Sequence, residues 1–208
     1  ENVVTYAERL LATMPDALGH VMFTCTGSEA NDIALRIARS YTRREGVIVT
    51  RLAYHGLTEA VAELSPSLGH FTPRSPRIRL IDAPDTLRIP AAEQGAKLAA
   101  DLAQAIAEMR ADGIEPAAFI GDTVFSSDGL HPDPAGFLKP AVDLIRAEGG
   151  LFIADEVQPG FARTGEAFWG FQRHGLVPDM VTMGKPMGNG FPLSGTAMRP
   201  ELVKEFGE

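Results

Sequence analysis

The chain has 208 residues, of which 45% are apolar, and it carries a formal net charge of −8. This length and apolar content suffice for one substantial core, so a single domain spanning residues 1–208 is expected. The negative charge disfavours nucleic acid and acidic membrane surfaces as partners. Cys25 is the only cysteine, which excludes an internal disulfide. No apolar run approaches the roughly 20 residues of a membrane span, and no signal-peptide pattern is found, so a cytoplasmic protein is expected.

Helical and strand-like patterns alternate along the chain. The first predicted helix begins near Ser28, because apolar residues recur on one helical face as far as Tyr41, and Gly46 is its expected end. The other predicted helices span residues 56–64, 93–111 and 137–147. Strands are predicted at residues 47–50, 78–81, 117–120, 151–154 and 180–183, with a loop at 65–76. This alternation predicts an α/β fold in three layers, α/β/α, around a mostly parallel sheet.

Thr26, Gly27 and Ser28 come directly before the first predicted helix. The first N–H groups of a helix lack intrahelical acceptors, and the helix dipole is positive at that end. Together with the hydroxyl of Ser28, they favour an anion such as a phosphate. An ordinary helix cap is the alternative interpretation, and the segment alone favours neither.

Tyr54 and Gly56 follow the strand predicted at residues 47–50. An aromatic ring at this position can lie against a flat cofactor, and a glycine lets the backbone turn closely. A tyrosine at a strand end more commonly serves packing. Its place after a turn suited to phosphate favours the cofactor.

Asp155 ends a strand whose preceding residues are apolar, so its carboxylate is costly to bury unless it is paired. A protonated ring nitrogen, a backbone amide or Arg163 would each provide that pairing. An acidic pair after an apolar strand is also found in Mg²⁺-dependent NTPases. That interpretation fails because Lys185 is followed by Pro186, and Asp179 stands where the phosphate-binding pattern requires glycine.

Lys185 lies in a glycine-rich loop after the last predicted strand. Lys185 and Asp155 therefore both follow strands, where open α/β sheets place their chemistry. An amine that can form a Schiff base and an anion that keeps a ring nitrogen protonated are what pyridoxal phosphate requires. The sequence thus predicts a pyridoxal phosphate site. No metal is expected, because the histidines are dispersed and cysteine occurs once.

The ordered set of motifs resembles the class III aminotransferases, which belong to the fold type I pyridoxal phosphate enzymes. The resemblance covers nearly the whole chain, from about Phe23 to Phe206. The motifs that carry it lie at residues 26–30, 53–56, 155–158, 160–165, 184–185 and 188–190.

This resemblance implies a role for each matching residue. Lys185 and Asp155 would be catalytic: Lys185 would form the Schiff base and move a proton, and Asp155 would pair with the pyridine nitrogen. The other implied cofactor contacts are Tyr54 and Val157 on the two ring faces, Gln158 at the phenolic oxygen, Thr26, Gly27 and Ser28 at the phosphate with His55 close by, and Asp122, which keeps a carboxylate at a glutamate position of the family.

The chain also departs from the family pattern. Ser127 stands where some members have a second glutamate that pairs with a substrate-gating arginine, so the usual recognition of a glutamate-type amino acceptor is not expected. The segments around Tyr54 and around Ser65 and Pro66 are similar to the branch that contains phospholyases. These enzymes use the same cofactor to eliminate phosphate from amino-alcohol phosphates.

The function implied by the resemblance is transfer of an amino group from an amine or amino acid to a keto acid or aldehyde. A phospholyase and a non-catalytic fragment that binds pyridoxal phosphate are the alternatives. Members of the family are roughly twice this length and have their active sites at a dimer interface. The chain therefore resembles the large, cofactor-binding domain without its N- and C-terminal small-domain segments, and a homodimer is expected for the full-length protein.

Overall fold

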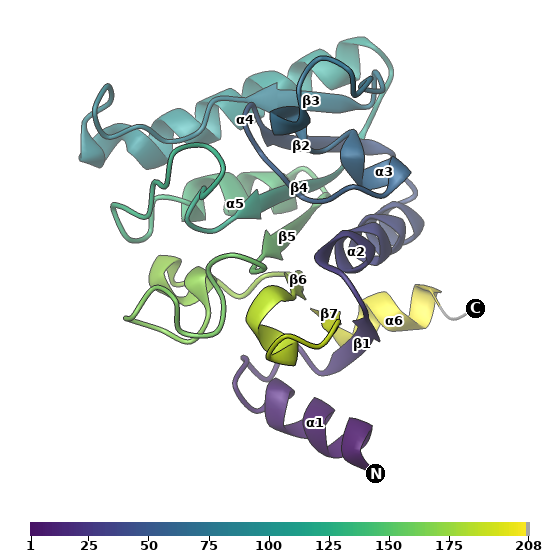
Figure 1. Cartoon of the computed structure of the whole chain (residues 1–208). Helices are drawn as coiled ribbons and strands as arrows, with labels where there is room; N and C mark the ends of the chain where they lie inside the picture. Colours follow the sequence, from purple (N-terminus) through teal and green to yellow (C-terminus); the bar gives the residue numbers. More distant parts are fainter. Residues whose placement is uncertain (207–208) are drawn as a thin grey trace.

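A computed structural model describes residues 1–206, and within them seven strands form one sheet in the order β1-β7-β6-β5-β4-β2-β3 (Figure 1). The strands from β6 to β3 run parallel to one another, whereas β7 is antiparallel to both of its neighbours. The prediction of a mostly parallel sheet is therefore confirmed. The strands are β1 (His20–Thr24), β2 (Gly46–Thr50), β3 (Ile78–Ile81), β4 (Pro116–Asp122), β5 (Leu151–Asp155), β6 (Met180–Met183) and β7 (Ser194–Met198).

Helices cover both faces of this sheet, which confirms the three-layer prediction. Helices α2 and α6 pack together on one face, and α4 and α5 pack together on the other (Figure 1). The helices are α1 (Asn2–Leu11), α2 (Gly27–Thr42), α3 (Glu59–Ala62), α4 (Gln94–Ala111), α5 (Lys139–Ala147) and α6 (Pro200–Phe206). Among the described residues, no helix combines the length and apolarity that a bilayer crossing requires.

The central strands are buried on both sides because their successive side chains enter different cores. Phe119 and Phe152 are neighbours in the β4–β5 ladder, and their rings, 5.6 Å apart, belong to the core under α4 and α5. Ile120 and Ile153, one position further along each strand, belong to the core under α2. Because these strands are packed on both sides, they fix the backbone positions of the residues that follow them.

Helix α2 begins at the residue that its capping chemistry selects. The hydroxyl of Thr26 accepts a hydrogen bond from the N–H of Glu29, and the Glu29 carboxylate accepts one from the N–H of Thr26 at 2.7 Å. The predicted end at Gly46 is wrong. Arg43 ends the helix in the left-handed conformation, with φ 57°, and Gly46 is already the first residue of β2.

Other boundaries and elements also differ from the sequence prediction. The helix expected at residues 56–64 is shortened to α3, the helix expected from residue 137 begins at Lys139, and the loop at 65–76 contains a 3-10 turn at Pro66–Leu68. Strands β1 and β7 and helices α1 and α6 were not predicted. Trp169 is completely buried and its indole N–H donates to the carbonyl of Thr13, as expected of a core residue.

Candidate active site

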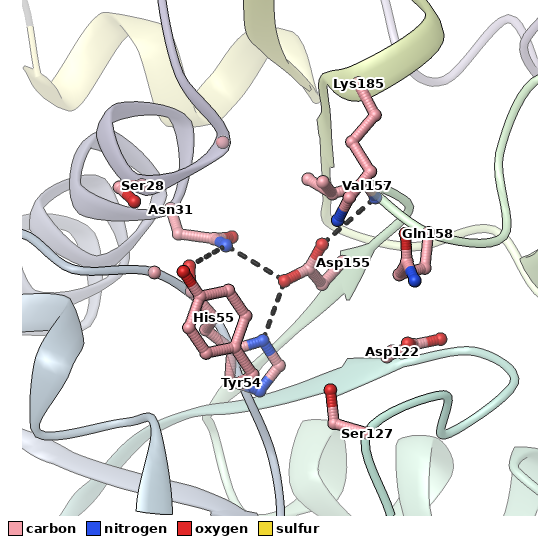
Figure 2. A pocket seen from close by; sticks show the side chains of 12 residues that line it. Ser28, Asn31, Tyr54, His55, Asp122, Ser127, Asp155, Val157, Gln158 and Lys185 are labelled. Carbon is pink, nitrogen blue, oxygen red and sulfur yellow. Dashed lines mark hydrogen bonds and ion pairs between the residues drawn. The ribbon is translucent and has the colours of Figure 1, made fainter. Parts of the chain in front are cut away.

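A pocket of about 220 Å³ opens at the carboxyl ends of β4, β5 and β6, in front of the N-terminus of α2. Asp122 and Asp155 are register partners in the β4–β5 ladder, so both carboxylates reach this edge of the sheet. Figure 2 shows side chains from widely separated segments pointing toward one another across the pocket. The lining residues are Gly27, Ser28, Asn31, Tyr54, His55, Gly56, Asp122, Ser127, Asp155, Val157, Gln158 and Lys185.

All of the predicted cofactor-binding residues except Thr26 line this pocket. Thr26 has another task, because its hydroxyl and its N–H both serve the cap of α2. The pocket also contains Asn31, Gly56 and Ser127, which were not among the predicted cofactor ligands. The sequence does indicate a role for Asn31, because this residue lies on the same helical face as Ala34 and Ala38. A polar side chain on an apolar face needs a hydrogen-bond partner.

Asp155 is the centre of a buried hydrogen-bond network, and its side chain is only 6% exposed. One carboxylate oxygen lies 2.7 Å from Nδ1 of His55 and accepts from Nδ2 of Asn31 at 2.9 Å. The other accepts from the N–H of Val157 at 3.1 Å. Arg163 is not a partner of Asp155, since its guanidinium donates to backbone carbonyls, including that of Val157 at 3.0 Å. The carboxylate is thus held mainly by neutral groups.

Two buried polar atoms beside Asp155 have no hydrogen-bond partner, namely Oδ1 of Asn31 and Nε2 of His55. Buried polar atoms are nearly always satisfied in folded proteins, so exceptions next to a pocket require an explanation. A bound molecule with its own polar groups would provide one.

Lys185 enters the pocket from the turn after β6, and Figure 2 shows its side chain extending toward Asp155. Its backbone has φ 45°, a left-handed conformation that is uncommon for a residue other than glycine and that is found disproportionately at functional sites. The side chain is exposed, yet partial desolvation lowers the pKa of the ammonium. The negative charge of Asp155 opposes this shift, and the positive charge of Arg163 adds to it. A larger fraction of neutral amine is therefore present at a given pH.

The N-terminus of α2 supplies hydrogen-bond donors to the pocket. The first N–H groups of the helix, at Gly27 and Ser28, have no acceptor within the helix. A Cβ atom on Gly27 would lie 3.1 Å from Cγ2 of Val157, and one on Gly56 would lie 2.5 Å from Oγ of Ser28. Both glycines therefore let three loops converge closely on a site that favours an anion.

Asp122 organises the loop that follows β4. Its carboxylate accepts hydrogen bonds from the N–H of Val124 at 2.9 Å and from the N–H and hydroxyl of Ser126. Burial raises the pKa of Asp122 above its ordinary value, although these hydrogen bonds act in the opposite direction. The loop presents Ser127 to the pocket, where its side chain is exposed.

These features fit pyridoxal phosphate. The pocket offers an amine of lowered pKa, a buried carboxylate, walls from Tyr54 and Val157, and a helix N-terminus suited to a phosphate. The unpartnered atoms beside the carboxylate indicate that its polar network continues into a bound molecule. In the part of the chain that the structure describes, no cluster of three or more His, Cys, Asp or Glu side chains could hold a metal ion.

Comparison with known proteins identifies the family. The sequence profile of the family described as aminotransferase class-III matches residues 1–208, and the chain belongs to this family. It is 36% identical over 99% of its length to an alanine–glyoxylate aminotransferase 2-like protein of Drosophila melanogaster, of which it covers 44%. It is also 36% identical over 97% of its length to ethanolamine-phosphate phospho-lyase homolog 1 of Caenorhabditis elegans, of which it covers 47%.

The fold is likewise that of a solved relative. A phospholyase from Arthrobacter in complex with phosphoethanolamine superimposes with a TM-score of 0.92 and 42% sequence identity, over 99% of this chain and 49% of that one. Class III aminotransferases depend on pyridoxal phosphate, which confirms the predicted cofactor of the family. The chain spans about half the length of the relatives it matches.

Proposed function

We propose that this chain is the cofactor-binding large domain of a class III aminotransferase that transfers an amino group from an amine or amino acid to a keto acid or aldehyde. The observation that carries the proposal is the convergence of Lys185 and Asp155 on one pocket, from the ends of neighbouring strands. When bound there, pyridoxal phosphate supplies an aldehyde that condenses with amines and a ring that withdraws electrons.

Each residue of the pocket has a definite task in this proposal. Asp155, held by His55 and Asn31, would keep a proton on the ring nitrogen of the bound cofactor. The amino group of Lys185 would hold the cofactor covalently until the substrate amine displaces it; the freed amine would then take the proton from the carbon that bears the substrate nitrogen and return it to the cofactor. The lowered pKa of Lys185 supports this because only the neutral amine can accept a proton.

The remaining lining residues bind and orient. The N–H groups of Gly27 and Ser28 would hold the phosphate, and Tyr54 and Val157 would pack against the ring. Gln158 lies beside Asp122 at the edge of the pocket in Figure 2, where it can donate to the phenolic oxygen. A fixed ring orientation matters because the bond to be broken must stay aligned with it.

The test is absorbance spectroscopy of the protein loaded with pyridoxal phosphate. The unaltered protein is expected to show a visible band from the covalently held cofactor, and Lys185→Ala is expected to lack it. Lys185→Arg is the matched control, because it keeps the positive charge but cannot form the Schiff base. An unchanged band in both variants would remove Lys185 from its role.

A phospholyase is the second candidate, because the chain matches the Arthrobacter phospholyase at 42% identity and has Ser127 at the pocket. Release of phosphate and ammonia from an amino-alcohol phosphate, without a keto acid, would support the lyase. Amine consumption that requires a keto acid would support the aminotransferase. Cofactor binding with neither reaction would support the non-catalytic alternative.

The assembly and location are also part of the proposal. A homodimer is expected because active sites of the family lie at a dimer interface, and sedimentation that shows only monomer at high concentration would refute it. The proposed cytoplasmic location rests on the single cysteine, which fits a reducing compartment. Fractionation of cells that express the complete protein would test it.

A further inference from the structure

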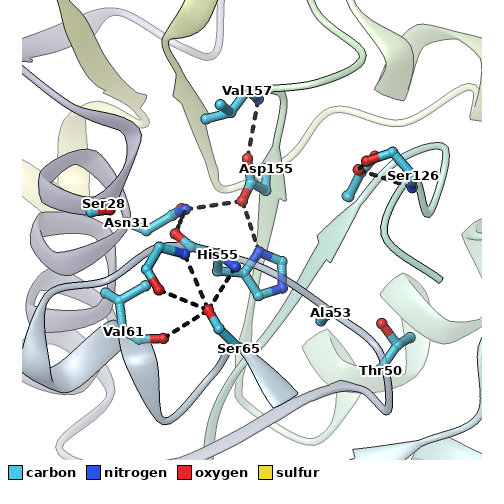
Figure 3. A network of polar contacts seen from close by, with 12 residues as sticks. Ser28, Asn31, Thr50, Ala53, His55, Val61, Ser65, Ser126, Asp155 and Val157 are labelled. Atoms are coloured by element: carbon cyan, nitrogen blue, oxygen red, sulfur yellow. Dashed lines mark hydrogen bonds and ion pairs between the residues drawn. The ribbon is translucent and has the colours of Figure 1, made fainter. Parts of the chain in front are cut away.

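Ser65 is completely buried, and none of the sequence motifs involves its hydroxyl in the chemistry. In Figure 3 this hydroxyl lies at the centre of the polar contacts behind the pocket. It accepts hydrogen bonds from the N–H groups of His55 at 2.9 Å and Gly56 at 3.1 Å. Its own proton can be donated to the carbonyl of Gly56 at 3.0 Å or of Val61 at 3.2 Å. Both lone pairs and the proton are therefore used.

The turn that Ser65 holds reaches Asp155 through two contacts. Nδ1 of His55 lies 2.7 Å from the carboxylate, and the backbone carbonyl of His55 accepts from Nδ2 of Asn31 at 2.7 Å. The same amide nitrogen of Asn31 donates to Asp155. A displacement of the His55 backbone would therefore disturb both side chains that orient the carboxylate.

The same turn also reaches the predicted phosphate site. The N–H of Leu57 donates to Oγ of Ser28 at 3.0 Å, and Gly56 lies against Ser28 with φ 138°, a backbone conformation that favours glycine. Because Oγ of Ser28 already accepts from Leu57, the proton of this hydroxyl stays available for an anion in the pocket. The turn thus directs a donor toward the phosphate.

Tyr54, one residue before His55, forms part of the pocket wall and is 40% exposed. The turn from Tyr54 to Leu57 therefore contacts the carboxylate, the ring face and the phosphate end of the site. The hydroxyl of Ser65 fixes the middle of this turn from behind, without touching the pocket.

We propose that Ser65 is a positioning residue for the cofactor, whose hydroxyl sets the turn that orients Asp155 through His55 and Ser28 through Leu57. This inference rests on the proposed function, since it concerns the same pocket. It predicts that loss of the hydroxyl weakens cofactor binding more than it weakens the fold.

The experiment compares Ser65→Ala with Ser67→Ala. Ser67 lies in the same loop and donates to the carbonyl of Ala53 at 2.9 Å, but it is exposed and is not among the residues that line the pocket. Two quantities are measured: the dissociation constant for pyridoxal phosphate by absorbance titration, and the rise in melting temperature that saturating cofactor produces. Neither requires turnover.

Ser65→Ala is expected to weaken binding about 10- to 100-fold, the range found when hydrogen-bond partners behind metal-ligating side chains are removed. The stabilisation by cofactor should shrink accordingly, while Ser67→Ala should behave like the unaltered protein. Ser65→Thr keeps the hydroxyl and is expected to restore most of the affinity. A Ser65→Ala protein that melts earlier but keeps its affinity and its full stabilisation by cofactor would overturn the inference.

Ser65→Cys carries the test if Ser65→Ala does not fold, because a thiol accepts hydrogen bonds more weakly than a hydroxyl. Unchanged affinity in this variant, or loss of folding in both, would show that Ser65 serves only the fold. Failure of the unaltered protein to bind pyridoxal phosphate would instead refute the proposed function, so the two failures are distinguishable.

Discussion

Asp155 and Asp179 are buried aspartates at opposite ends of the same sheet, with exposed fractions of 4% and 1%. Asp179 precedes β6, and its carboxylate meets Arg199 at 2.7 Å, Arg146 at 3.0 Å and the N–H of Phe152 at 2.9 Å. Asp155 ends β5 and is held by the neutral amide of Asn31, by the N–H of Val157 and by His55.

The difference separates an acid that serves the fold from one that serves a ligand. Asp179 has two cationic partners within the chain, which neutralise its charge. Among the described residues, no arginine or lysine forms an ion pair with Asp155, although Lys185 extends toward it, and Asp155 borders a pocket in which Asn31 and His55 keep unpartnered polar atoms. A buried carboxylate is costly without a cation, and the proposed cofactor would bring one to Asp155 as its protonated ring nitrogen.

The largest expected effect follows from Asp155→Asn. Removing the anion that faces the ring nitrogen should lower the turnover number about 100- to 1,000-fold, as loss of one preorganised electrostatic group does in other enzymes. The free energy of unfolding should also fall, but by less than this, because the isosteric amide still accepts at its oxygen while its NH2 group faces a donor from which the carboxylate accepted. Turnover at full cofactor occupancy and urea unfolding measure the two effects. Near-normal turnover would contradict the assignment.

Asp179→Ala should give the opposite result. Two arginines lose their shared partner, and the free energy of unfolding should fall by about 3 kcal/mol, the low end for a buried pair because both arginines are 31% exposed. Cofactor affinity of the protein that remains folded should be unchanged. Urea unfolding measures the free energy of unfolding, and absorbance titration measures the cofactor affinity. If the cofactor affinity of Asp179→Ala fell together with its free energy of unfolding, Asp179 would serve the ligand as well as the fold. The two buried aspartates would then not differ as proposed.

Glu156, next to Asp155 but turned away from the pocket, provides a third case. Burial raises its pKa from 4.5 to about 7, although Thr123, Gly170 and Phe171 all donate to it. The folded protein then keeps a proton that the unfolded chain releases, so the contribution of Glu156 to stability is fully present below pH 4.5 and is lost as the pH rises to about 7. The total change is about 3 kcal/mol.

The measurement is urea unfolding of the unaltered protein and of Glu156→Gln between pH 4.5 and 7.5. Glutamine cannot titrate, so the difference in unfolding free energy between the two proteins should decrease with rising pH. Parallel pH profiles would show that Glu156 has the same pKa in both states.

The smallest effect is expected at Asp82, an aspartate that pairs with Arg51 at 2.6 Å on the surface, where the two side chains are 63% and 59% exposed. Solvent screens such pairs, so Asp82→Asn should change the free energy of unfolding by less than about 1 kcal/mol. Cofactor affinity should not change. If urea unfolding showed a larger loss of free energy for Asp82→Asn, the stabilising effect of these aspartates would not follow from how deeply each one is buried.

Most strands of the sheet can be predicted from the sequence, because the apolar pattern that identifies each of them lies within the strand itself. The strands at Ile78–Ile81 and Met180–Met183 have the predicted boundaries, since each is a short apolar run between turn residues. Strand β7 was missed because serine, glycine, threonine and alanine form no apolar pattern, although all five of its residues are buried. Its assignment depends on pairing with β1 and β6, which is tertiary information.

The residues of the candidate site also divide into those with a local sequence signal and those without one. Lys185, Asp155 and Tyr54 were predicted because each stands in a recognisable segment at a strand end. Thr26 was predicted as a phosphate ligand, but the structure shows it engaged in the helix cap. Ser65 was missed as a contributor because a serine in a loop rich in proline and serine gives no local sign of the backbone groups it will meet.

Borohydride reduction of the protein loaded with pyridoxal phosphate, followed by mass mapping of its peptides, tests the central claim most directly. The account predicts that the reduced cofactor is attached to Lys185 and that Asp155→Asn keeps this attachment while turnover falls. Attachment to Lys97, Lys139 or Lys204, or no attachment at all, would contradict it.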